Sequence, residues 1–236
     1  MDIVRRIAVD FGGLSDPEEI EAVSFNDFAD EGGSSGYYTG VAEQSIVSVI
    51  SELLRGADAW GSFTRDGLLK VGKFVDPDTE TSVADVADVS SMTTSGADPL
   101  PVKRVRAGFQ RMWTVQGQES LAGAVSEADR LLYGSEFRFS AADATVVHVR
   151  ARDFEHRTYY DTEADASADA VAMRDRGKVR RRMFDVVSRG PLYQRRAGEV
   201  VTITAPEQGL ASGKKLWLRS ITEDAKDRST VLGGWG

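Results

Sequence analysis

The chain has no cysteine among its 236 residues, and this absence excludes several kinds of site. Without a thiol there is no disulfide framework, no thiolate metal ligand and no cysteine nucleophile. Such a composition is compatible with synthesis in the cytosol, or with a particle whose stability must not depend on redox state outside the cell. We therefore expect neither a disulfide-stabilised secreted domain nor a cysteine-based enzyme.

Long apolar runs and an excess of basic residues are also missing. No run approaches the roughly 20 apolar residues that a membrane-spanning helix needs, and Arg5 and Arg6 are not followed by the apolar region of a secretory signal. The 37 acidic side chains outnumber the 29 basic ones, which gives a net charge of -8. Since nucleic acids and anionic membranes attract basic surfaces, we expect no specific nucleic-acid binding and no stable membrane insertion.

Histidine is scarce, since only His148 and His156 occur. Their spacing matches neither a pair on one helix face nor a common zinc motif. We therefore interpret both as surface residues and assign no metal ligand, no cofactor and no catalytic residue. The 37 acidic residues make chance pairs of carboxylates certain, so their abundance alone does not indicate an acid–base site.

Helical and strand-like patterns succeed one another along the first two thirds of the chain. Apolar residues recur with helical spacing in several stretches, and Asp66-Gly67 between β-rich runs predicts a hairpin. The expected helices cover residues 2–10, 16–28, 42–55, 120–133 and 162–176, and the expected strands lie within 60–74, 102–115 and 180–187. Residues 143–152 fit either a strand, because of Val146 and Val147, or a helix.

The last forty residues contain three β-branched runs separated by glycine and proline, which predicts an antiparallel meander. The order of elements shows no regular alternation of strand and helix and therefore indicates an α+β fold. We expect mixed helices, antiparallel β-hairpins and a C-terminal β-meander or small barrel. The expected divisions are a helical and hairpin region over 1–116, a connecting region over 117–190 and the meander over 191–236.

The candidate functional residues are basic and aromatic. Arg180, Arg181 and Arg182 belong to the one basic cluster of the acidic chain, which could form a solvated helix end, bind phosphates or bind an acidic protein surface. Few aromatic residues accompany this cluster, so we favour protein over nucleic acid as the partner. Trp217 lies in a strand-like run, and Trp235 either belongs to a docked final strand or packs on a partner. These five residues are our interface candidates.

Several segments resemble the tail-tip or baseplate hub proteins of long-tailed bacteriophages and prophages. The final strands and turns follow the pattern of such proteins, with a "Gly-(Asp/Glu)-x-Val-x-Ile-x-x-Pro" strand, an "Ile-x-Glu-Asp" strand end and a closing Trp-Gly. The similar segments are Ile50–Gly72, Pro101–Gln116, Asp161–Val187, Gly198–Pro206, Ile221–Asp224 and Trp235–Gly236. One departure is the final strand, Val231-Leu232-Gly233-Gly234-Trp235, where alternating Leu and Thr are expected before the tryptophan.

The resemblance implies a hub-like fold and a structural role in the virion tail, after synthesis in the host cytoplasm. A hub protein is a ring, commonly a trimer, that closes the tail tube. It contacts the distal tail ring, the tape measure and the fibres or spike, and it opens when DNA is ejected. The chain would then be a homo-oligomer rather than an enzyme, and the five candidates would lie at its interfaces.

Two other functions remain open from the residues alone. A tail-associated, wall-degrading hydrolase would need two carboxyl groups ~5 to 9.5 Å apart, one of them with a raised pKa. A carbohydrate- or receptor-binding module would instead expose Trp and Tyr rings as stacking platforms beside a groove.

Overall fold

The computed structural model describes residues 2–31, 33–38, 40, 43–94, 101–121, 123–145, 148–190, 192–224 and 226–236. The chain divides into two compact units, each built from two separate stretches. Unit 1 comprises Met1–Lys73 and Val102–Lys178, and unit 2 comprises Phe74–Pro101 and Val179–Gly236. This division differs from the three consecutive regions expected from the sequence, because each unit is completed by residues distant along the chain.

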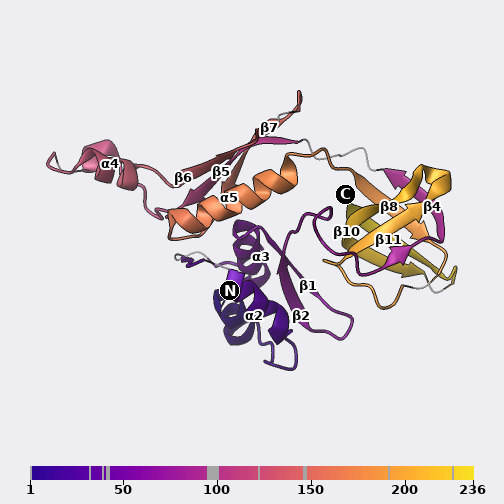
Figure 1. Ribbon diagram of the computed structural model, residues 1–236. Coiled ribbons are helices and arrows are strands. Elements are labelled where there is room, and N and C mark those ends of the chain that lie inside the picture. The colour runs from indigo at the N-terminus through magenta and orange to yellow at the C-terminus, as the bar shows by residue number, and fades with distance from the viewer. Residues whose placement is uncertain are drawn as a thin grey trace. The chain divides into compact units, whose positions relative to one another are not determined.

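The first part of unit 1 is a layer of helices on a β-hairpin (Figure 1). The helices are α1 (Asp2–Arg6), continued by a π-helical turn (Ile7–Phe11), α2 (Ala22–Glu31) and α3 (Ile46–Gly56). The Ser45 side chain caps α3 by accepting a hydrogen bond from the Ser48 amide. The strands β1 (Ala59–Phe63) and β2 (Leu69–Lys73) pair antiparallel through the expected turn.

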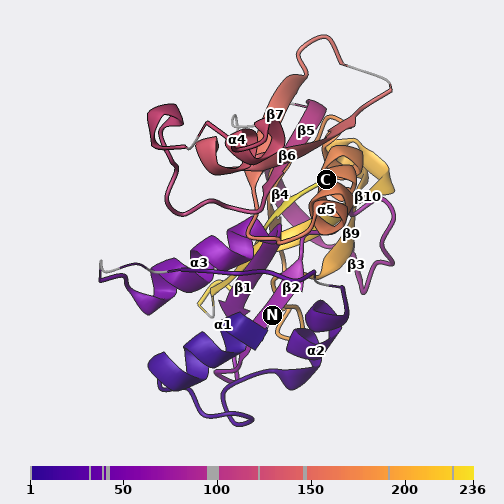
Figure 2. The ribbon, with the colours of Figure 1, turned by 90° about the vertical axis from the view of Figure 1, so that its left-hand side faces the viewer.

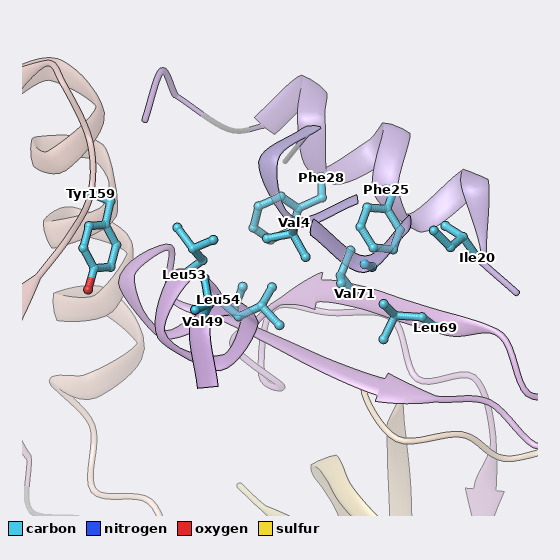
Figure 3. Close-up of a cluster of buried hydrophobic side chains, with 12 residues drawn as sticks. Val4, Ile20, Phe25, Phe28, Val49, Leu53, Leu54, Leu69, Val71 and Tyr159 are labelled. Carbon is cyan, nitrogen blue, oxygen red and sulfur yellow. The ribbon is translucent and has the colours of Figure 1, made fainter. Parts of the chain in front are cut away.

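One apolar core holds this layer together (Figure 3). Phe25 and Phe28 of α2 and Leu53 of α3 point toward the same interior, which Val71 of the hairpin closes. Their spacing of three or four residues on the helices places them on single faces. Tyr159, from a distant part of the chain, is a further member of this core.

The second part of unit 1 is a three-stranded sheet covered by one long helix. The sheet has the order β6 (Arg138–Asp143), β5 (Val102–Phe109), β7 (Arg152–Arg157), with β5 and β7 parallel. Helix α5 (Glu163–Gly177) lies along this sheet (Figures 1 and 2). Ala166 and Ala170 of α5 are fully buried with Val105 and Ala107 of β5, because these small side chains allow a close approach.

Unit 2 is a six-stranded sheet that curls on itself (Figure 1). Its order is β3 (Asp85–Val86), β9 (Val200–Ala205), β10 (Leu210–Asp224), β11 (Ser229–Trp235), β8 (Met183–Ser188) and β4 (Val89–Thr94). The long strand β10 pairs with β9 through its first half and with β11 through its second half. Only β3 is parallel to its neighbour.

Side chains alternate across the unit 2 sheet, as the strand period of two requires. One face gives the core, where Val201, Ile203, Leu216, Leu218 and Leu232 are fully buried. The final strand β11 lies between β10 and β8. Trp235 therefore belongs to a docked strand, which was one of the two alternatives for this residue.

The glycine pair of β11 lies where neighbouring atoms approach the backbone. A Cβ on Gly234 would meet the Trp217 carbonyl oxygen at 2.7 Å, and one on Gly233 would meet Ser220 Oγ at 2.4 Å. The ladder between β10 and β11 has a bulge between Leu218 and Ser220, beside these glycines.

The structure confirms the α+β class, the hairpin and the C-terminal antiparallel meander. Several helix and strand limits were wrong: α2 begins only at Ala22, β5 ends at Phe109, and α4 covers only Glu127–Gly134. Strands β6 and β7 were not predicted. The expected helix start at Ala42 and the ambiguous Val146 and Val147 lie outside the described residues.

Candidate functional site

The five sequence-predicted interface residues all lie in unit 2, and two of them are buried there. Trp217 of β10 and Trp235 of β11 are cross-strand partners with ring centroids 6.2 Å apart. Phe74 packs on Trp217 at 5.1 Å, leaving that tryptophan only 3% exposed. Trp217 therefore belongs to the packing of its own unit.

Arg181 is separated from its two neighbours by the direction of its side chain. It is buried and pairs with Asp76 and Asp78, each at 2.5 Å, while its guanidinium lies 5.7 Å from the Trp235 ring. Arg180 and Arg182 are exposed. The three arginines therefore differ in environment. Arg181 holds the 76–78 turn through two ion pairs, whereas the side chains of the other two are exposed.

Unit 1 holds a polar cavity of about 450 Å³ that the sequence did not reveal. Helix α3, the ends of β5 and β6, and strand β7 contribute its walls. The lining residues are Glu52, Arg55, Arg111, Glu136, Phe137, Phe154, Glu155, His156, Arg157 and Tyr159. Aromatic rings, guanidinium groups and carboxylates, all present in this lining, commonly bind small polar ligands in proteins.

Arg111 organises the charges on one side of this cavity. Its guanidinium lies 3.0 Å from the Glu136 carboxylate and 3.8 Å from that of Glu52, and it stacks 4.3 Å from the Trp113 ring. Trp113 in turn lies nearly parallel to Tyr159, with centroids 6.1 Å apart. Arg111 therefore links two carboxylates to an aromatic cluster.

The carboxylate of Glu52 is held in its ionised form. The Tyr159 hydroxyl donates a hydrogen bond to it, and this bond is the main reason that the pKa of Glu52 is lowered. Tyr37 also donates to Glu52 at 2.9 Å, and burial raises the pKa of Tyr37 to about 12. Glu52 can accept hydrogen bonds from a ligand, but it is not prepared to donate a proton as a general acid.

A second group of charges in unit 1 is largely buried. Asp58 accepts from Arg176 Nη2 through both oxygens at 2.7 Å, and Asp169 accepts from Lys73 and Tyr160, each at 2.8 Å. These bonds join α5 to the hairpin within unit 1. Burial raises the pKa of Asp58 to about 6, although the ion pair with Arg176 opposes this shift.

His156 belongs to the same region, so its interpretation as a surface residue was wrong. It is buried, and its Nε2 lies 3.2 Å from the Gly56 carbonyl oxygen. Burial lowers the pKa of His156, while Asp169 acts in the opposite direction. The ring therefore fixes the end of α3 against β7.

The raised pKa of Asp58 predicts a pH-dependent stability. Because protonation is easier in the folded than in the unfolded chain, the folded state gains stability as the pH falls through about 6. Relative to Asp58→Asn, the wild-type free energy of unfolding should rise by about 1.4 kcal/mol between pH 7 and pH 5. Urea unfolding at both pH values measures this difference, and a pH-independent difference would contradict it. Asp153→Asn, at an exposed aspartate, is the matched control.

Neither a metal centre nor a membrane span is found in the parts of the chain that the structure describes. Within the described ranges, no three His, Asp or Glu side chains gather closely enough to hold a metal ion. No helix within them is long and apolar enough to cross a membrane.

The amino-acid sequence matches no protein-family model and no curated protein. The fold, by contrast, has solved counterparts. A tail protein from Neisseria meningitidis MC58 matches 100% of this chain with a TM-score of 0.53 and 11% identity. The chain has the fold of a tail protein. A protein of the virion of a native gene transfer agent particle matches 99% of the chain, with a TM-score of 0.52 and 14% identity.

The tail-protein fold confirms the architecture implied by the sequence resemblance. The chain covers 66% of the Neisseria meningitidis protein and 46% of the gene transfer agent protein, so both are longer. Two cavity neighbours, Arg111 and Trp113, already lay within the similar segment Pro101–Gln116. Nothing in the sequence pattern indicated that Glu52 and Glu136 would join them.

Proposed function

We propose that the chain is a structural component of a phage tail tip, the baseplate hub, within the virion. In this role it closes the tail tube and links it to the distal tail ring and to fibre or spike proteins. The observation that supports this most strongly is the tail-protein fold over 100% of the chain. The similar segments of the C-terminal meander, including the docked Trp235-Gly236 end, support it independently.

The proposed role is mechanical and needs no reacting group. Subunits would form a ring, with a trimer favoured, and receptor engagement would shift the ring from closed to open. The partners would be further copies of the chain and neighbouring tail proteins. Arg180, Arg182 and the half-buried Trp235 remain the accessible candidates for these interfaces.

Labelling of particles tests the location. Gold-labelled antibodies against the chain should bind at the distal end of the tail in negative-stain images of the parent particles. Particles made without the gene should lack this label and have defective tail ends, and expression of the intact gene should restore both. Label along the whole tube, or on the head, would contradict the hub proposal.

A second candidate function is binding of a carbohydrate in the unit 1 cavity. It is favoured by the 450 Å³ volume and by the combination of Arg111, Arg157 and Glu136 with aromatic walls. Oligosaccharides from the host envelope, titrated by calorimetry, should bind to the wild type and lose affinity in Glu136→Gln. Absence of binding to every envelope fraction would rule this function out.

A further inference from the structure

The connection between β5 and β6 forms an arm without a core of its own. The arm comprises residues 114–135 and includes α4. Two backbone hydrogen bonds hold its base, from the Met112 amide to the Glu136 carbonyl at 2.8 Å and from the Gln116 amide to the Tyr133 carbonyl at 2.9 Å. Figure 1 shows α4 at the end of this connection that lies away from β5 and β6.

The arm exposes apolar side chains that a solvated loop does not require. No described side chain between 114 and 135 is buried, and α4 buries none of its residues. Val115 is 49% exposed, Leu131 62% and Tyr133 41%. An eight-residue helix is marginal in water, because short helices owe their stability to packing of an apolar face. The arm therefore has the character of a segment that is covered in an assembly.

The arm is also acidic, which restricts the surface that can cover it. Its charged residues are Glu119, Glu127, Asp129 and Arg130. A surface of opposite character lies at the start of β8 in unit 2, in the segment Val179–Arg182, which we call the basic edge. There Arg180 and Arg182 are exposed and Val179 is 46% exposed. Arg182 exchanges two backbone hydrogen bonds with Gly236, at 3.0 and 3.1 Å, which hold the backbone at this end of the edge.

We propose that the arm of one copy docks on the basic edge of a second copy of this chain. Leu131 and Tyr133 would be buried beside Val179, and Glu127 would face the exposed arginines. Since arm and edge are different surfaces, the contact is head-to-tail, and such contacts close into a ring when the rotation permits. This inference rests on the ring assembly of the proposed function and assigns the surfaces that form it.

Charge reversal tests the pairing of these two surfaces. The arm variant is Glu127→Arg, and the edge variant combines Arg180→Glu with Arg182→Glu. Each alone should raise the dissociation constant of the oligomer at least about tenfold, since like charges then oppose one another. A chain that carries all three substitutions should associate again, because its arm and its edge then have opposite charges once more. Light scattering after size exclusion, over a range of concentrations, measures all of these masses.

Two further variants separate the contact from effects on folding. Glu163→Arg is the matched control for Glu127→Arg, because both glutamates directly follow the capping residue of an α-helix and are exposed. It should leave the oligomer unchanged. Leu131→Ser should weaken association without changing the circular dichroism spectrum of the chain.

The outcomes distinguish this inference from the function on which it rests. An oligomeric wild type that is indifferent to both charge reversals overturns the arm contact but leaves the ring in place. A wild type that is monomeric at every concentration overturns the contact and also the self-assembled ring. Association of the arm with another tail protein only, in a pull-down from disrupted particles, assigns the arm to that protein instead and overturns self-docking.

Discussion

Arg181→Ala should lower the free energy of unfolding by about 3 kcal/mol. Removing one partner from a buried ion pair generally costs ~3–5 kcal/mol, because the remaining charge is left uncompensated. Here the lower end of this range applies, since the Asp78 side chain is 50% exposed and can be hydrated. Asp76 is more enclosed and loses its partner at 2.5 Å. Urea unfolding monitored by tryptophan fluorescence measures the change.

Arg182→Ala is the matched control for this prediction. It removes an identical side chain one residue further on, and because Arg182 is exposed its loss should change stability by less than about 0.5 kcal/mol. If both variants lowered the free energy of unfolding equally, the buried ion pairs of Arg181 would not contribute the predicted stability. Asp76→Ala combined with Arg181→Ala should cost less than the two single losses added together, since both remove the same interaction.

The contrast between Arg181 and Arg182 illustrates what the sequence could not provide. Three consecutive arginines identify a basic segment, and alternation along an extended chain implies that the middle one points away from the other two. Which side is buried depends on Asp76 and Asp78, which lie about a hundred residues earlier in the chain and are brought back by the fold. A long-range partner of this kind leaves no trace in local composition.

The elements that could be predicted are those with strong local signals. Asp66-Gly67 marked the hairpin between β1 and β2, and the Ala- and Asp-rich composition of 162–176 predicted the helix that the structure shows as α5, with Thr162 as its capping residue. Strands β6 and β7 of the second sheet were missed. Strand β7 pairs parallel to β5, and such a pair is joined by a long crossover instead of a short turn with a recognisable sequence motif. The helical pattern of 120–133 gave only the short α4, and α4 buries none of its residues, so no packed apolar face extends it.

The cavity of unit 1 could not be predicted either, because its residues come from segments that are distant along the chain. Glu52 comes from α3, Arg111 follows β5, and Tyr159 follows β7, so three distant segments supply its main polar groups. Each residue has an ordinary local context. The hydroxyl of Tyr159 and the guanidinium of Arg111 become significant only where they meet the Glu52 carboxylate. Because the pKa of Glu52 is lowered, chiefly by the hydrogen bond from Tyr159, Glu52 is a poor general acid.

Gly234→Val should destabilise the protein by about 3 kcal/mol, although valine is the better strand former. Strand propensity alone would favour valine by up to roughly 1 kcal/mol. The structure predicts the opposite sign, because a Cβ at this position would lie 2.7 Å from the Trp217 carbonyl oxygen in the neighbouring strand. The backbone of β10 or β11 must then move, and overpacking a filled interior costs ~1–3 kcal/mol, occasionally more. Urea unfolding gives the sign directly.

The neighbouring glycine provides the control that separates backbone from side-chain crowding. A Cβ on Gly233 meets Ser220 Oγ at 2.4 Å, so Gly233→Ala should be destabilising alone and largely rescued by Ser220→Ala. No side-chain truncation can rescue Gly234 in this way, because the carbonyl that it meets belongs to the main chain. The Gly-Gly departure from the expected Leu and Thr pattern is therefore required by the close approach of β10 to β11. A stabilised Gly234→Val would show that the strands are further apart than this and that the departure has no structural cause.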